Sequence, residues 1–306
     1  VIKFGSVFSG IDAAATALKR MSLQYVVEFV SDTDPVCQNI LKEVHAPKKV
    51  WGDVLGISPK DKPYVDVYVF TPPCQDFSSN GKMAGSAGPR RTGVLCARAL
   101  KYVRQKQPRV CIFENVPTLA AQKFKPFLDG MCKFIKESGY NVHYKVMDSR
   151  NYGLPHARRR IFVVGIRKDC VTRGCTAFEW PKPLKTPSIN VILDKLGPKD
   201  LPGGLPKSKA QRDRVVDAYK KCFANGVDPR TTTVSVDVDC SKQFSSYGVD
   251  DMKTLTRNRG GAGGPWISTR GRRTNLGELL KAGWGLMWGT MARLAVGTDV
   301  LRRRIS

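Results

Sequence analysis

The strongest constraint on the fold is a regular alternation of short apolar runs and amphipathic stretches through the first two-thirds of the chain. Runs rich in β-branched and aromatic residues predict strands at residues 2–8, 25–31, 65–70, 110–113 and 161–166. Helical periodicity predicts helices at residues 11–21, 35–44, 92–105 and 124–137. Alternating strands and helices of this kind predict an α/β fold, a parallel sheet with helices on both faces.

The pattern changes after Trp180, where prolines punctuate a stretch with little periodicity before a region rich in lysine and arginine. Val234, Val236 and Val238 alternate with polar residues, which predicts a half-exposed strand. Helical patterns return at residues 274–280 and 296–305. We therefore expect a first domain over residues 1–180, a small irregular lobe over 181–255 and a return of residues 256–306 to the first domain.

The charge of the chain favours a polyanionic partner. Lys and Arg number 51 against 26 Asp and Glu, a formal net charge of +25, and 42% of residues are hydrophobic, which excludes a wholly disordered basic tail. Nucleic acid is the first candidate, and an enzyme that is basic for other reasons is the alternative. We expect no membrane span, because no run of about 18 apolar residues occurs. The first residues lack the layout of a secretion signal, so we expect an intracellular protein.

The cysteines favour reduced thiols. Nine of them are scattered without a repeating interval, which is unlike a disulfide framework. Cys170 and Cys175 lie close together, but no second pair or histidine cluster accompanies them. We therefore expect no metal site.

One of these cysteines follows an apolar run directly. Residues 70–78 read Phe-Thr-Pro-Pro-Cys-Gln-Asp-Phe-Ser, so Cys74 lies just beyond an expected strand and opens a Gly- and Ser-rich loop. Ligands of open α/β sheets bind beyond the carboxyl ends of the strands. Cys74 is therefore a candidate nucleophile, and the alternative is a small apolar residue that closes the core.

A carboxylate ends another expected strand at residues 110–117. If this strand is the neighbour of the one before Cys74, Glu114 faces the same cleft. A partly buried carboxyl group can hold a proton and deliver it to a ring nitrogen. A strand-end glutamate on the surface is the alternative.

Three arginines open a further expected strand. Alternation within a strand would direct Arg158 and Arg160 to one face and Arg159 to the other. Two guanidinium groups on the cleft side would suit a phosphate or a base carbonyl, whereas a solvated cluster is the alternative.

The first strand, turn and helix resemble a nucleotide-binding turn without the usual glycine pattern. Asp32 and Asp34 follow the second strand, and Asp53 follows a third short one. Carboxylates at successive strand ends can bind ribose hydroxyls and an exocyclic amine, and each can equally cap a helix.

Taken in order, these motifs resemble the cytosine-5 DNA methyltransferase family. The resemblance rests on the turn from Phe8 to Gly10, on Pro73-Cys74-Gln75 with Phe77 and Ser78, on Glu114-Asn115-Val116 and on Arg158-x-Arg160, and it resumes at residues 254–256 and 270–284. Each motif alone is weak, but their shared order is specific. The resemblance implies a Rossmann-like methyltransferase sheet with a target-recognition lobe at 181–255.

The resemblance also implies roles. Cys74 would attack carbon-6 of a flipped cytosine, Glu114 would protonate ring nitrogen-3, and Arg158 and Arg160 would hold the base carbonyl and nearby backbone. The implied substrate-positioning residues are Gln75, Ser78 and Asn115. S-adenosylmethionine, leaving as S-adenosylhomocysteine, would be bound by Phe8, Ser9, Gly10, Ile11, Asp32, Thr33, Asp53, Val54, Pro73 and Leu95.

The implied partner is double-stranded DNA, over which the loop at residues 79–93, with Lys82, Arg90 and Arg91, would close. We expect a monomer with modest sequence specificity, because the recognition lobe is short. A DNA-acting protein would work in the nucleus of a eukaryote, or in the cytoplasm or nucleoid of a bacterium or virus-infected cell.

The chain departs from the family pattern at three places. Asp12 stands where the family usually has Gly, His156 where it usually has Gln, and residues 289–291 lie only a short distance after Trp284. A tRNA cytosine-5 methyltransferase of the same superfamily is one alternative, against which the Asp76-Phe77-Ser78 sequence argues. A catalytically degenerate DNA-binding or regulatory homologue is the other.

Overall fold

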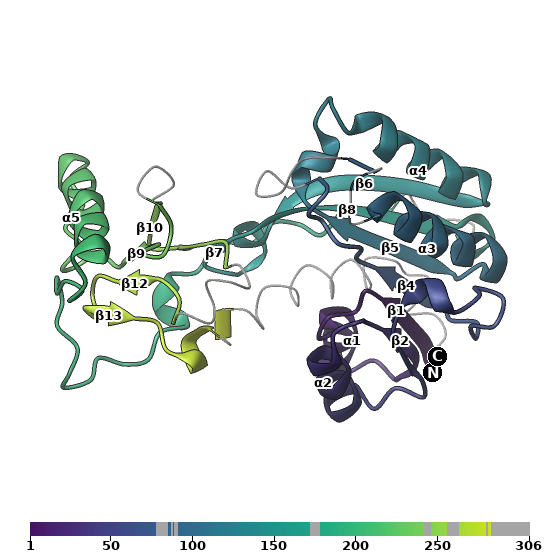
Figure 1. Ribbon diagram of the computed structural model, residues 1–306, viewed down its shortest axis with the longest axis horizontal. Coiled ribbons are helices and arrows are strands. Elements are labelled where there is room, and N and C mark those ends of the chain that lie inside the picture. Colours follow the sequence, from purple (N-terminus) through teal and green to yellow (C-terminus); the bar gives the residue numbers. More distant parts are fainter. Residues whose placement is uncertain are drawn as a thin grey trace. The chain divides into compact units, whose positions relative to one another are not determined.

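The computed structural model describes residues 1–77, 85–86, 88, 91–171, 178–241, 246–255, 263–279 and 281–282 (Figure 1). The chain forms two compact units. The first contains Val1–Met147 and Arg159–Pro181, and the second contains Asp148–Arg158 and the described residues from Lys182 onward.

A seven-stranded sheet forms the centre of the first unit. In spatial order its strands are β3 (Val50–Trp51), β2 (Tyr25–Ser31), β1 (Ile2–Val7), β4 (Val67–Phe70), β5 (Val110–Asn115), β8 (Arg159–Arg167) and β6 (Tyr140–Asp148). The first five run parallel, with Phe4 of β1 beside Val67 and Phe70 of β4 beside Phe113. The predicted α/β fold is thus confirmed.

One strand departs from the all-parallel prediction. β8 runs antiparallel to β5, with Glu114 opposite Phe162 and Asn115 opposite Ile161. β8 follows β6 without an intervening α-helix and inserts between β5 and β6. A parallel arrangement needs a long crossover connection, whereas an antiparallel strand does not.

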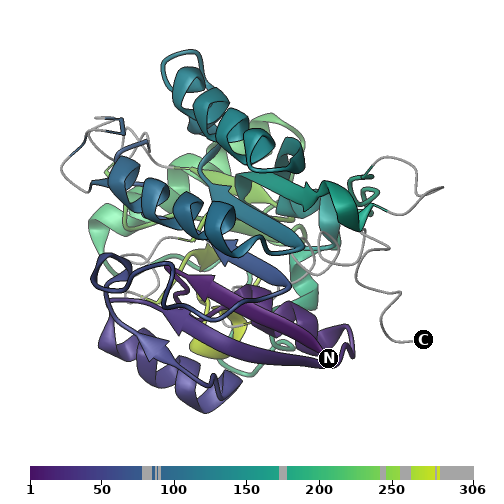
Figure 2. The ribbon, with the colours of Figure 1, turned by 90° about the vertical axis from the view of Figure 1, so that its right-hand side faces the viewer.

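Helices cover the sheet. They are α1 (Ala13–Arg20), α2 (Pro35–His45), α3 (Thr92–Lys106) and α4 (Lys125–Glu137). Side chains of α3 and α4 join Tyr68 and Phe70 of β4 in one hydrophobic core. Figure 2 shows these two helices side by side. Val67 and Val69 alternate with these residues and are equally buried, so both faces of β4 are covered.

The second unit has its own small core. α5 (Lys209–Ala224) packs against β9 (Val234–Val236), which lies between β10 (Tyr247–Val249) and β12 (Trp266–Ile267); β13 (Arg272–Arg273) completes this sheet. The strand predicted around Val234 is confirmed as β9, but its predicted half-exposure is wrong, because β9 is paired on both sides and Ser235 is buried as well.

Residues beyond 255 belong to this second unit as far as the structure describes them. β12 pairs with β9, and residues 276–279 and 281–282 are helical, in the region where a helix was predicted. The compact units therefore divide the chain differently from the sequence-based bounds. The predicted helix at 296–305 lies outside the described residues.

A short parallel pair joins β7 (His156–Ala157) to β11 (Met252–Lys253). His156, which departs from the family pattern, is fully buried, and its Nε2 accepts a hydrogen bond of 2.8 Å from the backbone N–H of Leu255. The remaining short elements are 3₁₀ helices: η1 (Val54–Gly56), η2 (Pro117–Ala120), η3 (Ser149–Tyr152), η4 (Lys168–Cys170) and η5 (Ile189–Val191).

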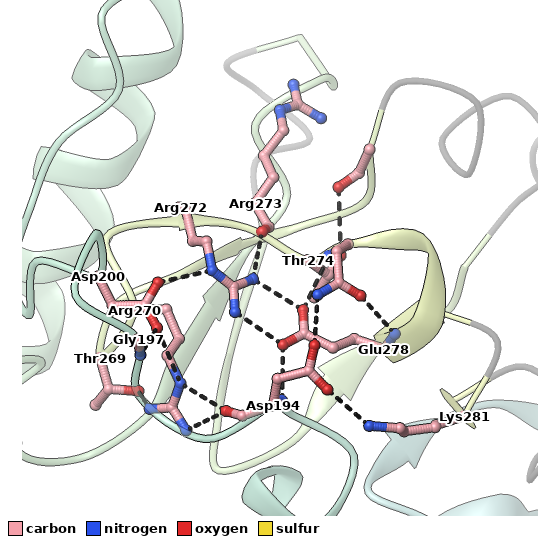
Figure 3. Close-up of polar contacts among 12 residues, drawn as sticks. Asp194, Gly197, Asp200, Thr269, Arg270, Arg272, Arg273, Thr274, Glu278 and Lys281 are labelled. Atoms are coloured by element: carbon pink, nitrogen blue, oxygen red, sulfur yellow. Dashed lines mark hydrogen bonds and ion pairs between the residues drawn. The ribbon is translucent and has the colours of Figure 1, made fainter.

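In the second unit, a network of ion pairs and hydrogen bonds joins residues 194–200 to residues 270–281 (Figure 3). Arg272 contacts Asp200 at 2.8 Å and donates two hydrogen bonds, of 2.9 and 3.0 Å, to the fully buried Glu278. Glu278 and Asn275 each accept a bond from the backbone N–H of the other, a reciprocal cap at a helix start. The backbone N–H of Asp194 donates to Glu278 as well, so donors from three residues, Asp194, Arg272 and Asn275, meet at one carboxylate.

Among the described helices, none is long and apolar enough to cross a membrane.

Candidate active site

The carboxyl ends of five parallel strands meet at one edge of the sheet. Phe8 follows β1, Asp32 follows β2, Asp53 follows β3, Cys74 follows β4, and Glu114 lies near the end of β5. Their strands are neighbours in the order β3, β2, β1, β4 and β5. The predicted site residues therefore lie along one rim of the first unit.

The segment carrying Cys74 is anchored at several backbone atoms. The Asn115 side-chain amide donates to the Pro72 carbonyl at 3.1 Å, and the Thr92 hydroxyl oxygen lies 3.2 Å from the Pro73 carbonyl. A turn closes where the Phe77 N–H donates to the Cys74 carbonyl at 3.0 Å. Cys74 is half-buried against the hydrophobic core. Asn115 thus positions the cysteine segment from the neighbouring strand.

Asp76 holds the other side of this segment, a contribution that sequence reasoning missed. Its carboxylate, which is 2% exposed, accepts bonds from the Thr92 hydroxyl at 2.7 Å and the Thr92 N–H at 3.3 Å. Thr92 begins α3, and Arg91 at the cap position provides no side-chain cap. The signal available in the sequence was a helix start without a capping Ser, Thr, Asp or Asn.

Glu114 and Arg160 form an ion pair across β5 and β8. Arg160 Nε lies 2.9 Å from Glu114 Oε1, with the two side chains 18% and 14% exposed. The antiparallel register places them near one another, because Asn115 is opposite Ile161. The structure therefore brings together two predicted residues that lie far apart in the sequence.

Arg158 does not belong to the same compact unit as Arg160. It belongs to the second unit, between β7 and β8, and its backbone N–H donates to the Ser149 hydroxyl at 3.2 Å. Arg159, not Arg158, begins β8 and is exposed. The predicted strand alternation therefore applies to Arg159 and Arg160 only.

The turn after β1 is unusual in its backbone. Phe8, Gly10 and Asp12 all have positive φ, of 58°, 54° and 50°. The Gly10 N–H donates to the Asp32 carboxylate at 2.7 Å, joining this turn to the end of β2. Asp12 occupies a left-handed conformation, which Gly and Asp adopt more readily than most residues, so Asp is compatible with a position where the resemblance predicts Gly.

The remaining predicted residues vary in exposure. Gln75, Thr33 and Ile11 are exposed, Val54 is buried, and Leu95 is half-buried against the core. Asp53 caps η1 through a 2.9 Å bond from the Leu55 N–H, and Asp34 caps α2. Ser78, Lys82, Arg90 and residues 284–306 lie outside the described residues. Among the described residues, no group of three or more His, Cys, Asp or Glu side chains could hold a metal ion.

Comparison with known proteins assigns the chain to a family. The family model for C-5 cytosine-specific DNA methylases matches residues 2–268, so the chain belongs to this family. It is 30% identical over 204 residues to the type II methyltransferase M.MthTI of Methanothermobacter thermautotrophicus, covering 67% of this chain and 57% of that protein. It is 29% identical over 235 residues to M.HhaI of Haemophilus parahaemolyticus, covering 77% and 66%. The chain thus spans about three-fifths of the length of these relatives.

Solved structures share the fold. The Entamoeba histolytica methyltransferase EhMeth matches with a TM-score of 0.59 at 14% identity, covering 100% of this chain and 99% of that one. The S. pombe Dnmt2 methyltransferase matches with a TM-score of 0.59 at 12% identity, covering 99% of each.

Proposed function

We propose that this chain transfers a methyl group from S-adenosylmethionine to carbon-5 of cytosine in double-stranded DNA. The observation that carries the proposal is the Glu114–Arg160 ion pair on the strand next to the anchored Cys74 segment. A nucleophile, a proton carrier and a cation on adjacent strand ends form the set that this chemistry requires.

Each residue has a task that follows from its position. The Cys74 thiolate adds to carbon-6 of the base, which makes carbon-5 electron-rich. Glu114 supplies a proton to ring nitrogen-3, and Arg160 keeps the Glu114 carboxyl oriented while its remaining donors meet the base carbonyl. Once carbon-5 carries the methyl group, loss of the carbon-5 proton, elimination of the thiolate and return of the nitrogen-3 proton to Glu114 restore the enzyme. A base within a duplex cannot reach this rim, so the cytosine must flip out.

The chain's own residues fit the methyl donor. S-adenosylmethionine, when bound, supplies the methyl group. Phe8 offers an apolar surface at the end of β1, and Asp32 and Asp53 offer carboxylates for hydroxyl groups at the next two strand ends. A Cβ atom at Gly10 would meet nothing within 4 Å, so the turn leaves room for a ligand. Ser9, Ile11, Thr33, Val54, Pro73 and Leu95 complete the proposed binding set.

The proposed partner contacts follow from charge and from the second unit. Basic residues far outnumber acidic ones from Lys253 to the end of the sequence, which suits phosphate contacts. We assign target recognition to the second unit and expect a monomer that acts wherever its DNA lies, in a nucleus or a nucleoid. The short recognition region favours a site of few base pairs.

A mechanism-based adduct tests the proposal directly. Duplex DNA containing 5-fluorocytosine should form a denaturation-resistant adduct with the wild-type chain in the presence of S-adenosylmethionine, and Cys74→Ser should form none. Cys132→Ser, at a buried thiol on α4, is the matched control and should retain the adduct. A wild-type chain that binds DNA without any adduct would favour a regulatory protein, and methyl transfer to total tRNA instead of duplex DNA would favour the tRNA alternative.

A further inference from the structure

A continuous chain of hydrogen bonds runs beneath the proposed cofactor rim. The Ser31 N–H donates to the Ser9 hydroxyl at 3.1 Å, the Ser9 and Ser6 hydroxyls are 2.7 Å apart, and the Ser6 hydroxyl donates to Asp12 Oδ2 at 2.5 Å. The other carboxylate oxygen of Asp12 accepts from the Ala15 N–H at 2.9 Å. The Ser31 hydroxyl makes a separate hydrogen bond of 2.7 Å to the Gly52 carbonyl.

The direction of these bonds is set by the donors available. A hydroxyl has one hydrogen, so once Ser6 donates to Asp12, Ser9 is the donor in the 2.7 Å bond to Ser6, and the Ser31 carbonyl, 3.2 Å from the Ser9 hydroxyl, is a more distant acceptor for the same hydrogen. The Ser31 N–H, the Ser9 hydroxyl and the Ser6 hydroxyl then donate in sequence toward Asp12. Chains of this kind are cooperative in a low-dielectric interior, because each bond polarises the next.

These hydrogen bonds link the carboxyl ends of three neighbouring strands. Ser6 lies in β1, Ser31 ends β2, and Gly52 follows β3. Ser6, Asp12 and Ser31 are only 2%, 3% and 1% exposed. These side chains therefore lie below the surface, directly before the residues that would meet the cofactor: Phe8, Asp32 and Asp53.

The turn above this chain needs external support. Three of its five residues have positive φ, and two of those are not glycine. Asp12 restrains it at one end by capping α1 and accepting from Ser6, and Asp32 restrains it at the middle through the Gly10 N–H. Thr16 and His45 add contacts behind it, with His45 Nε2 3.1 Å from the Ile11 carbonyl.

We propose that Asp12, Ser6, Ser9 and Ser31 are positioning residues that fix the Phe8–Asp12 turn and the ends of β2 and β3 as one preformed cofactor rim. The inference rests on the proposed function for the identity of the ligand. It assigns to Asp12 a role that the family's usual Gly has no side chain to perform.

Two substitutions at one position separate this role from backbone strain. Asp12→Gly accepts the positive φ but removes the end of the chain, whereas Asp12→Asn keeps an oxygen that accepts from the Ala15 N–H and an amide N–H that donates to the Ser6 hydroxyl. Affinity for S-adenosylhomocysteine, measured by calorimetry, should fall about tenfold in Asp12→Gly, the change expected for one lost hydrogen bond of ordinary strength. Asp12→Asn should stay within about twofold of wild type.

Ser6→Ala is a second test variant. The Ser6 hydroxyl is buried and cannot touch the cofactor, so a change in cofactor affinity would have to act through the turn. We again expect about tenfold weaker binding. Ser138→Ala is the matched control, a buried serine in the same unit whose hydroxyl bonds the Phe134 carbonyl at the end of α4. It should lose stability without losing affinity. Equal affinities for wild type, Asp12→Gly and Ser6→Ala would overturn the proposal.

Hydrogen exchange of the unliganded proteins tests the rigidity of the Phe8–Asp12 turn without relying on cofactor binding. Protection of the Gly10 amide should fall about tenfold in Asp12→Gly and in Ser6→Ala, and should persist in Asp12→Asn and Ser138→Ala. Unchanged Gly10 protection in the first two variants would also refute the role. A wild-type chain that protects Gly10 but binds no S-adenosylhomocysteine would refute the proposed function and leave the positioning role supported.

Discussion

At the scale of single residues, the proposed chemistry depends on side chains held by neighbouring strands. Cys74 lies on a segment tied to Asn115 and Thr92, and Glu114 is tied to Arg160. None of these partners is close to its counterpart in the sequence. The rim is consequently positioned before any substrate arrives, which is how a site avoids the cost of reorganisation during reaction.

Removing the proton carrier should affect the chemical step strongly. Glu114→Gln keeps the shape of the side chain but cannot transfer a proton, so the rate of methyl transfer to duplex DNA should fall by about 10²-fold or more. Single-turnover kinetics with labelled S-adenosylmethionine measure the change. Glu137→Gln, at a surface position, is the control and should transfer methyl groups at the wild-type rate. A Glu114→Gln enzyme with an unchanged single-turnover rate would remove Glu114 from the chemistry.

Asp12 should give the first unit a distinctive pH dependence. Burial raises the pKa of its carboxyl group, and this effect outweighs the opposing bonds from the Ser6 hydroxyl and the Ala15 N–H and the interaction with His45, which lower it. The folded state then holds the proton more tightly than the unfolded state, so stability falls as pH rises from the ordinary value of 3.8 through the raised pKa. Asp12→Asn should lose this slope in chemical denaturation measured across that range. A slope that persists in Asp12→Asn would assign it to another group.

At the scale of elements, side chains from distant segments cap the start of α3 and hold the helix that begins after Asn275 in place. α3 begins at Thr92 because Asp76, from the cysteine segment, supplies the cap that Arg91 does not. In the second unit, Arg272 and Glu278 hold a helix start against residues 194–200 (Figure 3). Both devices join segments that are separated along the chain.

Loss of the Arg272 clamp should destabilise the second unit. Glu278 is fully buried, and removing Arg272 leaves its charge without its main partner, although the arginine is 31% exposed. We expect Arg272→Met to cost about 2 kcal/mol, a buried-pair penalty reduced for solvent screening. Urea denaturation measures it, with Arg230→Met, at an exposed pair with Asp228, as a control that should cost far less. Equal costs for the two would contradict the clamp.

At the scale of the whole molecule, a net charge of +25 should dominate the strength of DNA binding. Because each neutralised phosphate releases counterions, affinity should fall steeply as salt rises from 50 to 200 mM, by about 10³-fold if six phosphates are contacted. Fluorescence anisotropy with a labelled duplex measures the slope. Affinity that does not change with salt would mean that the charge is not placed against DNA.

Much of the first unit follows from local pattern. Strand 25–31 agrees with β2, and the predicted helix at 92–105 ends one residue before α3 does. α5 was missed, although Val215, Ala218, Tyr219 and Cys222 follow the i, i+3, i+4, i+7 spacing, because its many charged residues mask a narrow apolar stripe. The antiparallel direction of β8 was not predicted, because its short, helix-free connection becomes evident only once residues 140–148 are known to form β6.

The sequence by itself determined the strand and helix alternation, the order of the motifs and the excess of positive charge, because periodicity, spacing and composition are properties of neighbouring residues. Only the tertiary structure decided that Glu114 pairs with Arg160, that Asp76 caps α3 and that Arg158 belongs to a different unit from Arg160. It also decided that the Ser6 and Ser9 hydroxyls link Asp12 to the Ser31 N–H at the end of β2. These contacts depend on strand order and register, which bring together residues that local sequence patterns cannot relate.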